Sequence, residues 1–280
     1  MMIRVKNEAE WIQASLLSLN GFADEAIIIE NYSDDDSYEK IKEIIPKLKY
    51  KVILRKEKST EFDYVSNLAL SLTSYSWIFR WDGDFIGHTS GDNGLKNLRN
   101  YILALPSTNF YVIYPLLVNF YGDLFHVMKD KPLHSEGYIH SYHKRLEYFK
   151  KHNSIEVLKV PFFFKIINYQ KIVMFHAGTA KTLQRMIYRS LWSEWLNNIK
   201  RYDHPTFKSY LSYKFSNNKD LSRKYIIDEM EEKIKKTVKY SVEKFGDYPE
   251  LMKPFLEKPT LKIIYKDVKP WSRNDFKNEI

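Results

Sequence analysis

The sequence predicts an α/β fold in which helices flank a mixed, mainly parallel β-sheet. Two observations support this prediction. Short apolar runs alternate with amphipathic helical patterns over the first 85 residues, and three strand–helix units follow one another, which implies right-handed crossovers between parallel strands. Ligands of such sheets bind at the carboxyl ends of the strands. The side chains that follow the predicted strands are therefore the first candidates for a functional site.

The elements of this sheet begin at the amino terminus. Apolar runs predict strands, whereas a helical apolar period, shown by Ile12, Leu16 and Leu19, predicts a helix. Ser33, which is followed by acidic residues, marks the start of another helix. The predicted strands are 2–5, 26–29, 51–54 and 77–80, and the predicted helices between them are 10–19, 36–45 and 64–72.

The rest of the chain has a less regular pattern. Pro106 ends one predicted helix, and Pro115 indicates a bend in a long buried strand. An apolar stripe from Ile227 to Val238 predicts a late helix. The predicted elements are a loop at 87–94, a helix at 95–105, a strand at 110–120, loops and hairpins over 121–160, helices at 182–197 and 221–245, and an irregular tail punctuated by prolines.

The composition is that of a globular protein. Of 280 residues, 44% are hydrophobic and 28% charged, so neither a disordered nor a fibrous protein fits. The lack of cysteine excludes disulfides, thiolate metal sites and a cysteine nucleophile. The most apolar stretch, 110–122, is too short to span a membrane, and the amino terminus shows no secretory signal. We therefore expect a cytoplasmic protein.

The charge is unevenly distributed. The net charge of +9 comes from 44 Lys and Arg against 35 Asp and Glu. Residues 1–100 hold 13 basic and 16 acidic side chains, so the remainder holds 31 and 19. This asymmetry indicates an acidic site in the first part and an anionic partner for the second, such as a phosphorylated substrate, a membrane surface or nucleic acid. A solvated, lysine-rich surface explains it equally well.

Asp82-Gly83-Asp84 is the sharpest local feature. Its two carboxylates follow a predicted buried strand and are separated by one small residue, so both can face one ligand. Carboxylate oxygens suit a hard divalent cation such as magnesium or manganese, with positions left for phosphate oxygens. By itself the triplet is a weak signal, because an acidic turn gives the same pattern.

Four blocks of sequence, taken in order, resemble the family 2 glycosyltransferases of the GT-A fold, and the resemblance extends from residue 2 to about residue 195. The blocks are Arg4-Val5-Lys6-Asn7-Glu8, the run from Ala23 through Glu30-Asn31-Tyr32-Ser33-Asp34-Asp35-Asp36-Ser37, Asn67-Leu68-Ala69-Leu70, and Asp82-Gly83-Asp84. Their order and spacing are more specific than any single block. The chain departs from the family at Glu30, where the family has Asp, and at Arg80 and Trp81, where it has aliphatic residues.

The resemblance implies a metal-dependent, inverting transferase that moves a sugar from a nucleotide-sugar, with a UDP-sugar favoured, to a hydroxyl of a glycan or of a phosphorylated or lipid-linked acceptor. It implies a GT-A domain over 1–180, with a nucleotide-binding half (1–85) and an acceptor half (86–180), and a helical extension over 181–280 packed on it. The donor-binding residues are then Arg4, Lys6, Glu30, Asn31, Asp35, Asp82 and Arg185. Manganese or magnesium would bind Asp82, Asp84 and His176.

His176 ends a short apolar run before a predicted helix. A histidine at such a place is more often a buried structural residue, but in the resembling family a histidine before the carboxy-terminal helices often reaches the metal or the diphosphate. The predicted helix carries Lys181, Arg185 and Arg189 at intervals of four residues. This basic stripe either binds phosphate or faces solvent.

An inverting transfer needs a carboxylate that takes the proton of the acceptor hydroxyl. The family places this base between the Asp-x-Asp and the histidine. We predict Glu136, which precedes a flexible glycine and lies between His134 and Tyr138. Asp123 is the nearest rival, because it also lies beside a glycine. The other carboxylates of this interval are Asp92, Asp130, Glu147 and Glu156.

Two other functions stay open at this point. A nucleotidyltransferase that joins an NTP to a sugar phosphate would need a Gly-rich loop after the first strand, where this chain has no glycine. A nucleic-acid-binding protein would need a basic stripe interleaved with exposed aromatic residues, whereas the aromatic residues here fall mostly at core-like positions. We expect no nucleic-acid partner, and we expect peripheral contact of the basic part with an anionic membrane.

Overall fold

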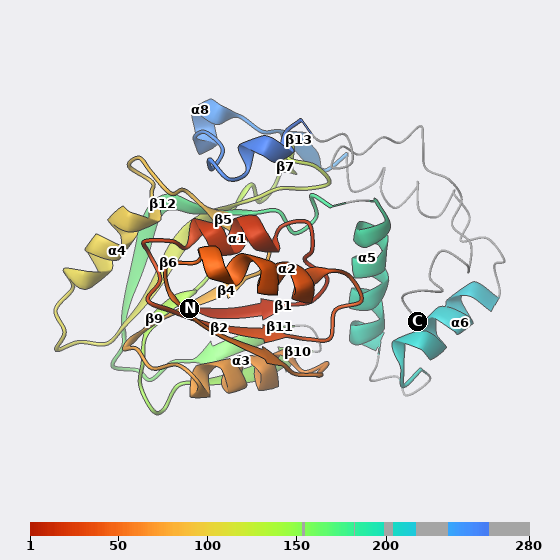
Figure 1. The fold of residues 1–280 in the computed structure, drawn as a ribbon, viewed down its shortest axis with the longest axis horizontal. Helices are drawn as coiled ribbons and strands as arrows, with labels where there is room; N and C mark the ends of the chain where they lie inside the picture. Colours follow the sequence, from red (N-terminus) through yellow and green to blue (C-terminus); the bar gives the residue numbers. More distant parts are fainter. Residues whose placement is uncertain (153–154, 182, 199–203, 217–234, 258–280) are drawn as a thin grey trace.

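The computed structural model describes residues 1–152, 155–181, 183–198, 204–216 and 235–257 (Figure 1). The first elements are β1 (Met2–Val5), α1 (Ile12–Ser18), β2 (Glu25–Glu30), α2 (Ser37–Ile44), η1 (Ile45–Lys47), β3 (Lys51–Lys56), α3 (Phe62–Ser71), β4 (Trp77–Asp82), β5 (Phe85–Gly87), α4 (Leu95–Leu103) and β6 (Tyr111–Asn119). There follow β7 (His126–Met128), β8 (Leu133–Ser135), β9 (Ile139–Ser141), β10 (Glu147–His152), β11 (Ile155–Lys159), β12 (Lys165–His176), α5 (Leu183–Asn198), α6 (Phe207–Ser216), β13 (Thr237–Lys239), α8 (Val242–Phe245) and η3 (Lys253–Phe255).

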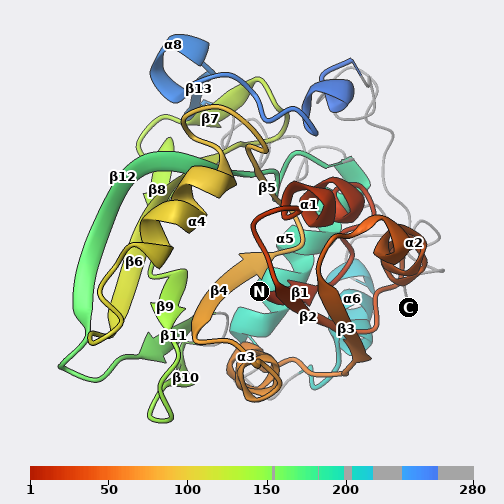
Figure 2. The same cartoon turned by 60° about the vertical axis from the view of Figure 1, so that its left-hand side comes forward.

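In the described residues, nine strands form one mixed sheet with the order β3-β2-β1-β4-β9-β6-β12-β5, and β8 pairs with β6. The four strands β3, β2, β1 and β4 are parallel. The long strand β12 runs parallel to β6, and Figure 2 shows the two side by side along the part of the sheet farthest from β3. Val5 lies opposite Glu30, and Arg4 lies opposite Asp82, so these strands end together. The predicted fold class is confirmed.

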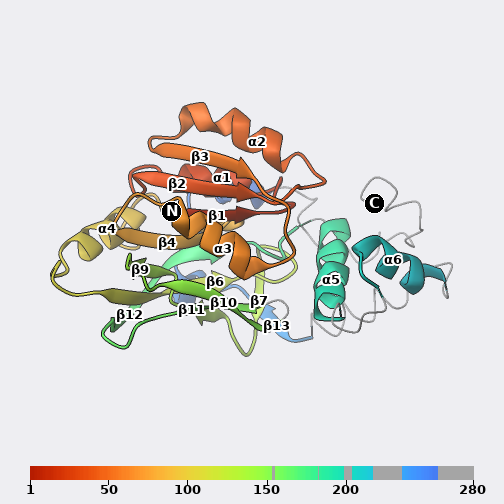
Figure 3. The ribbon, with the colours of Figure 1, turned by 90° about the horizontal axis from the view of Figure 1, so that it is seen from below.

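Helices cover both faces of the sheet. Apolar side chains of α1, α2 and α4, such as Leu16, Ile41 and Leu98, pack on one face. On the other face α3 packs with the β10–β11 hairpin, where Val65 and Tyr148 belong to the same buried cluster. Figure 3 shows α2 and α3 on opposite sides of the parallel strands and α5 standing beyond the strand ends. The sheet therefore leaves its carboxyl edge to be covered by α5.

Two predictions about the second half of the chain are wrong. Within 121–160 we predicted loops and hairpins over the sheet edge, but β9 lies inside the sheet, between β4 and β6. A strand of three residues is too short to show a period. The predicted helix 221–245 is wrong over 235–245, because β13 pairs with β7 there and a separate short helix, α8, follows. Residues 221–234 lie outside the described residues. Ser241 caps α8 by accepting a hydrogen bond from the Lys244 backbone N–H.

The carboxy-terminal segment 235–257 packs against the start of α1 and the end of β6. Trp11 of the α1 N-cap is fully buried, its indole N–H donates to the Ala180 carbonyl at 2.9 Å, and its ring lies 4.5 Å from that of Phe255. Tyr240 and Tyr248 pack against Phe120 at the end of β6. The division into a domain over 1–180 and an extension over 181–280 stays a prediction.

Among the described residues, no helix combines the length and the apolar character that crossing a membrane requires.

His140 provides a test of this packing by pH. The imidazole is fully buried in β9, with Nε2 3.3 Å from the Tyr148 hydroxyl and Nδ1 3.3 Å from the Ser141 carbonyl, and burial lowers its pKa to about 4. An unfolded histidine has a pKa near 6.5, so between about pH 4 and 6.5 the unfolded chain binds a proton that the folded chain excludes. Stability therefore rises with pH through this window.

We expect His140→Gln to remove that part of the pH dependence. Between pH 7 and pH 4 the wild type should lose on the order of 3 kcal/mol more free energy of unfolding than the variant. Urea unfolding at a series of pH values measures the difference. Parallel pH profiles for the two proteins would contradict the assignment.

Candidate active site

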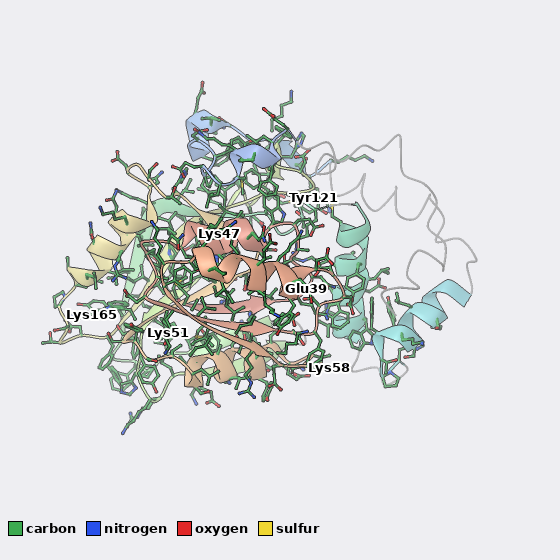
Figure 4. All side chains as sticks on the ribbon, in the orientation of Figure 1. Glu39, Lys47, Lys51, Lys58, Tyr121 and Lys165 are labelled. Carbon is green, nitrogen blue, oxygen red and sulfur yellow. The ribbon has the colours of Figure 1, made fainter. Side chains whose placement is uncertain are left out.

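A cavity of about 220 Å³ lies where β1 and β4 end. Its walls come from residues 4–8, from Asn31, from residues within 59–65, from 82–84 and, across the gap, from Lys181 and α5. Figure 4 shows Lys51 at the start of β3 and Lys58 past its end, toward α5, while Lys165 lies at the far side. The cavity is thus at the carboxyl edge, where parallel sheets bind ligands.

Asp82 closes β4 and faces this cavity. Its Oδ1 atom accepts a hydrogen bond from Arg4 Nη2 at 3.0 Å. The Arg4 guanidinium also pairs with the buried Glu156 of β11 and lies 5.4 Å from the centre of the Phe62 ring. Arg80, on the same strand as Asp82, donates to the same oxygen of Glu156 at 3.0 Å. A carboxylate from a distant hairpin therefore fixes both arginines near the end of β4.

Asp84 is the most buried carboxylate of the cavity, with 2% of its surface exposed. Its Oδ2 atom lies 3.2 Å from Arg189 Nη1 and 3.4 Å from Lys181 Nζ, and its Oδ1 atom lies 3.4 Å from His176 Nε2. Burial alone would raise its pKa, but His176, Lys181 and Arg189 together hold the pKa of Asp84 well below the usual range. Asp84 is therefore an ionised carboxylate surrounded by nitrogen donors.

Glu8 is a second buried carboxyl in the cavity wall. Its Oε2 atom accepts a hydrogen bond from Lys181, and its backbone carbonyl accepts from Trp11 and Ile12 at the start of α1. Burial, reinforced by the charge of Asp84, raises the pKa of Glu8 to about 8. Glu8 lies in the first block of the resemblance, and the resemblance implies no role for it.

His176, Lys181 and Arg189 come from one stretch of chain that runs from the end of β12 into α5. His176 Nδ1 lies 2.9 Å from Asn119 Oδ1, which orients the ring toward Asp84. Arg189 Nη1 also donates to the Gly178 carbonyl. His176 and Arg189 thus meet at Asp84, and they are joined there by Lys181. The Arg185 side chain lies outside the described residues.

Lys6 and Asn31 form the outer wall of the cavity. The Lys6 ammonium donates to the carbonyls of Asn31 and Tyr32 at 3.1 and 3.0 Å and lies 5.2 Å from the centre of the Trp192 ring. Burial lowers the pKa of Lys6. The Asn31 amide exchanges hydrogen bonds with the backbone of Ser59 at 2.6 and 3.0 Å. Both predicted donor residues therefore line the cavity and hold its neighbouring loops.

Glu30 and Asp35 are used inside the following turn instead. Glu30 is fully buried, and its Oε1 atom accepts from the Ser33 backbone N–H at 2.6 Å. Asp35 accepts from the backbone N–H of Ser37 at 3.0 Å and of Ala9 at 3.2 Å. Neither side chain is among those that line the cavity. Their predicted contacts with a nucleotide stay predictions.

The two candidate bases lie away from the cavity wall. Glu136 accepts from Arg80 Nη2 at 2.6 Å and contacts His134 Nε2 at 2.9 Å. The hydrogen bond from His134 and the charge of Arg80 lower the pKa of Glu136 to about 2. Asp123 contacts His126 Nδ1 at 2.9 Å and accepts from the Phe125 backbone N–H at 2.7 Å. Neither residue lines the cavity.

The arrangement of the carboxylates in the cavity does not suit the binding of a divalent cation. Among the described residues, no three His, Asp or Glu side chains lie together in a way that could hold a metal ion. Asp82 is paired with Arg4, and Asp84 is paired with Lys181 and Arg189. Magnesium and manganese bind several oxygen ligands and are repelled by nearby cations.

No protein-family model and no curated protein sequence matches the chain. Among solved structures, it is similar to S. aureus TarS 1–349 in complex with UDP, at 18% identity and TM-score 0.32, over 43% of this chain and 34% of that chain. It is similar to the mannosyltransferase PcManGT from Pyrobaculum calidifontis in complex with GDP-Man and Mn²⁺, at 13% identity and TM-score 0.43, over 75% and 68%. It is also similar to the inositol-1-phosphate CTP transferase from T. maritima, at 10% identity and TM-score 0.39, over 62% and 87%. The chain spans about a third of the TarS structure's length.

Sequence reasoning missed several side chains that the fold brings to the site. Trp192, Tyr188 and Phe62 give the cavity aromatic walls, and Glu156 holds the arginines behind it. Trp192 lies three residues after Arg189, so the helical period of the basic stripe could have pointed to it. Glu156 is one of the candidate bases in the sequence, but nothing in the local sequence predicts its pairing with Arg4 and Arg80.

Gly178 leaves room for the side chains of His176 and Arg189, which both lie close to its backbone. A Cβ atom at residue 178 would lie 2.2 Å from His176 Nε2 and 3.0 Å from Arg189 Nη1. We expect Gly178→Ala to displace the ring and to cost about 1–3 kcal/mol in the free energy of unfolding.

The same substitution made in a His176→Ala background should cost clearly less, because the closest contact is gone. Thermal and urea unfolding of the four proteins in this cycle measure the coupling. Equal costs of Gly178→Ala in both backgrounds would show that the glycine is not needed for the histidine.

Proposed function

We propose that the protein is a glycosyltransferase that moves a sugar from a nucleotide-sugar donor to a hydroxyl of a glycan or of a phosphorylated or lipid-linked acceptor. The observation that supports this most is the composition of the cavity wall. It brings together parts of three separate sequence blocks on which the resemblance rests, namely residues 4–8, Asn31 and residues 82–84. The fourth block ties α3 to β10, because the Asn67 amide exchanges hydrogen bonds of 2.7 and 2.8 Å with the Tyr148 backbone.

The chemistry of the cavity suits a nucleoside diphosphate. Phe62, Tyr188 and Trp192 provide aromatic surface for a base or ribose. Lys181 and Arg189 provide cations at the inner end, beside Asp84. Positioned cations stabilise the charge that grows on a departing diphosphate, which is the main demand of this reaction. We propose a UDP-sugar as the favoured donor.

The proposed transfer is inverting, with one carboxylate as general base. Glu136 remains our predicted base and Asp123 its rival, although the contacts that lower the pKa of Glu136 make it a weaker proton acceptor. Glu8 is a third carboxyl, with a raised pKa and a place in the cavity wall. The proposal of manganese or magnesium at Asp82, Asp84 and His176 conflicts with the ion pairs of Asp82 and Asp84.

We further propose that the basic second part of the chain contacts an anionic acceptor or membrane surface in the cytoplasm, and not nucleic acid. The support is the charge asymmetry of the sequence, because residues 101–280 hold 31 basic and 19 acidic side chains. Co-sedimentation with anionic liposomes at low and physiological salt tests the membrane contact, and no association at either salt would remove it.

A donor screen tests the proposed function. Calorimetry with UDP-, GDP-, CMP- and dTDP-sugars, each with manganese and with EDTA, should show binding of one nucleotide class, with UDP bound at least about tenfold more tightly than uridine. Lys6→Met should weaken the binding of UDP, because it removes a cation from the outer wall of the cavity. Lack of binding by every nucleotide-sugar, or conversion of an NTP and a sugar phosphate to a nucleotide-sugar, would refute the proposal.

Single-turnover rates identify the base. Replacing the true base by its amide should lower turnover by roughly 10²–10⁴ with little change in donor affinity, because the base acts in the transition state. We expect this loss in Glu136→Gln, with Asp123→Asn and Glu8→Gln as comparisons. A near-normal rate in Glu136→Gln, together with a selective loss in one of the other two, would transfer the role to that residue.

A further inference from the structure

The two carboxylates expected to hold a metal each have a cation of the protein beside them. Asp84 lies 3.2 Å from Arg189 and 3.4 Å from Lys181, and Asp82 lies 3.0 Å from Arg4. A divalent ion bound to the Asp84 oxygen would have to approach the two positive groups that already contact it. The ion and the side-chain cations therefore compete for the same position.

The positive groups at Asp84 are held in place by further contacts. Lys181 is only 4% exposed and also bonds to Glu8. It directly follows Ala180, whose carbonyl accepts the Trp11 indole N–H. Arg189 is anchored by the Gly178 carbonyl and by Asp84. These contacts fix the two cations before any ligand arrives, which is what electrostatic stabilisation of a transition state requires.

Arg189 can contact a ligand while it keeps its bond to Asp84. Its side chain is 47% exposed and lines the cavity, whereas Asp84 lies behind it, 3% exposed. A guanidinium has several N–H donors in one plane, so one edge can bind a carboxylate and another a phosphate. The geometry thus places a positive surface, backed by a carboxylate, where a diphosphate would lie.

We propose that Lys181 and Arg189 bind the donor's diphosphate in place of a divalent cation, and that Asp84 positions these two side chains instead of a metal. This inference rests on the proposed function. In the transfer step, the acceptor oxygen forms a bond to the anomeric carbon as the bond from that carbon to the β-phosphate oxygen breaks. The electron pair of the broken bond stays on the phosphate oxygen, facing the two cations, and the acceptor proton passes to the base carboxylate.

Calorimetric titration of the full chain with UDP, or with GDP if the donor screen selects it, tests the inference. We expect the dissociation constant in EDTA to lie within about threefold of that in manganese, because the side chains supply the counter-charge. Electron paramagnetic resonance gives a second readout. The protein should not bind free Mn²⁺, and it should not increase the Mn²⁺ bound by the nucleotide alone.

Variants test which side chains bind the diphosphate. Arg189→Gln should weaken binding of the diphosphate at least about tenfold in EDTA and leave uridine binding unchanged, and Arg189→Lys should restore part of the affinity. Lys181→Met removes the lysine that bonds to the buried Glu8 and one of the two side-chain cations at Asp84, so we combine it with Glu8→Gln to protect folding, and thermal unfolding checks each protein. Lys165→Met is the matched control, because it removes one positive charge at the far side of the sheet (Figure 4).

The outcomes separate this inference from the function on which it rests. Binding that appears only with manganese, or full affinity of Arg189→Gln in EDTA, would overturn the inference and leave a nucleotide-sugar transferase in place. If no nucleoside diphosphate binds in either condition, both proposals are overturned. Binding in EDTA that is lost in Arg189→Gln but kept in Lys165→Met supports both.

Discussion

The charge of Asp84, buried after β4, is the constraint on which the site depends. Taking a carboxylate out of water costs several kcal/mol unless partners compensate it. The partners come from the end of β12, from the residue that precedes α5 by two positions, and from α5 itself. α5 is thereby drawn across the carboxyl edge of the sheet, and it brings Tyr188 and Trp192 to the cavity wall. One ionised group thus links the position of a helix to the shape of the cavity.

Apolar packing holds the same arrangement from the other side. The buried Trp11 links α1 to Ala180 by a hydrogen bond and to Phe255 by ring contact. Glu8 is three residues before Trp11 and bonds to Lys181, which is one residue after Ala180. An ion pair and a hydrogen bond therefore join the same two segments side by side. The segment before α5 is fixed at two adjacent points.

The sequence was most informative where structure depends on local periodicity. The first 85 residues alternate as predicted, because each element there shows its own apolar pattern. The short strands β9 and β13 depend on distant partners, and no local pattern predicts them. The same holds for the site. The Asp82-Gly83-Asp84 turn and the basic residues at 181 and 189 could be predicted, whereas the pairing of Glu156 with Arg4 and Arg80, 152 and 76 residues away, could not. The orientation of the Glu30 side chain could not be predicted either, because it depends on one hydrogen bond, in which the Ser33 backbone N–H donates to the Glu30 carboxylate.

The position of Glu156 also has a consequence for the order in which the chain is made. Arg4 and Arg80 share one oxygen of this buried carboxylate. As the chain leaves the ribosome, both arginines emerge long before Glu156, and Asp84 emerges about a hundred residues before Arg189. The early strands therefore exist for a time without the charges that neutralise their ends. Vectorial synthesis can build the interior of the sheet early, but its functional edge is completed only when α5 has been translated.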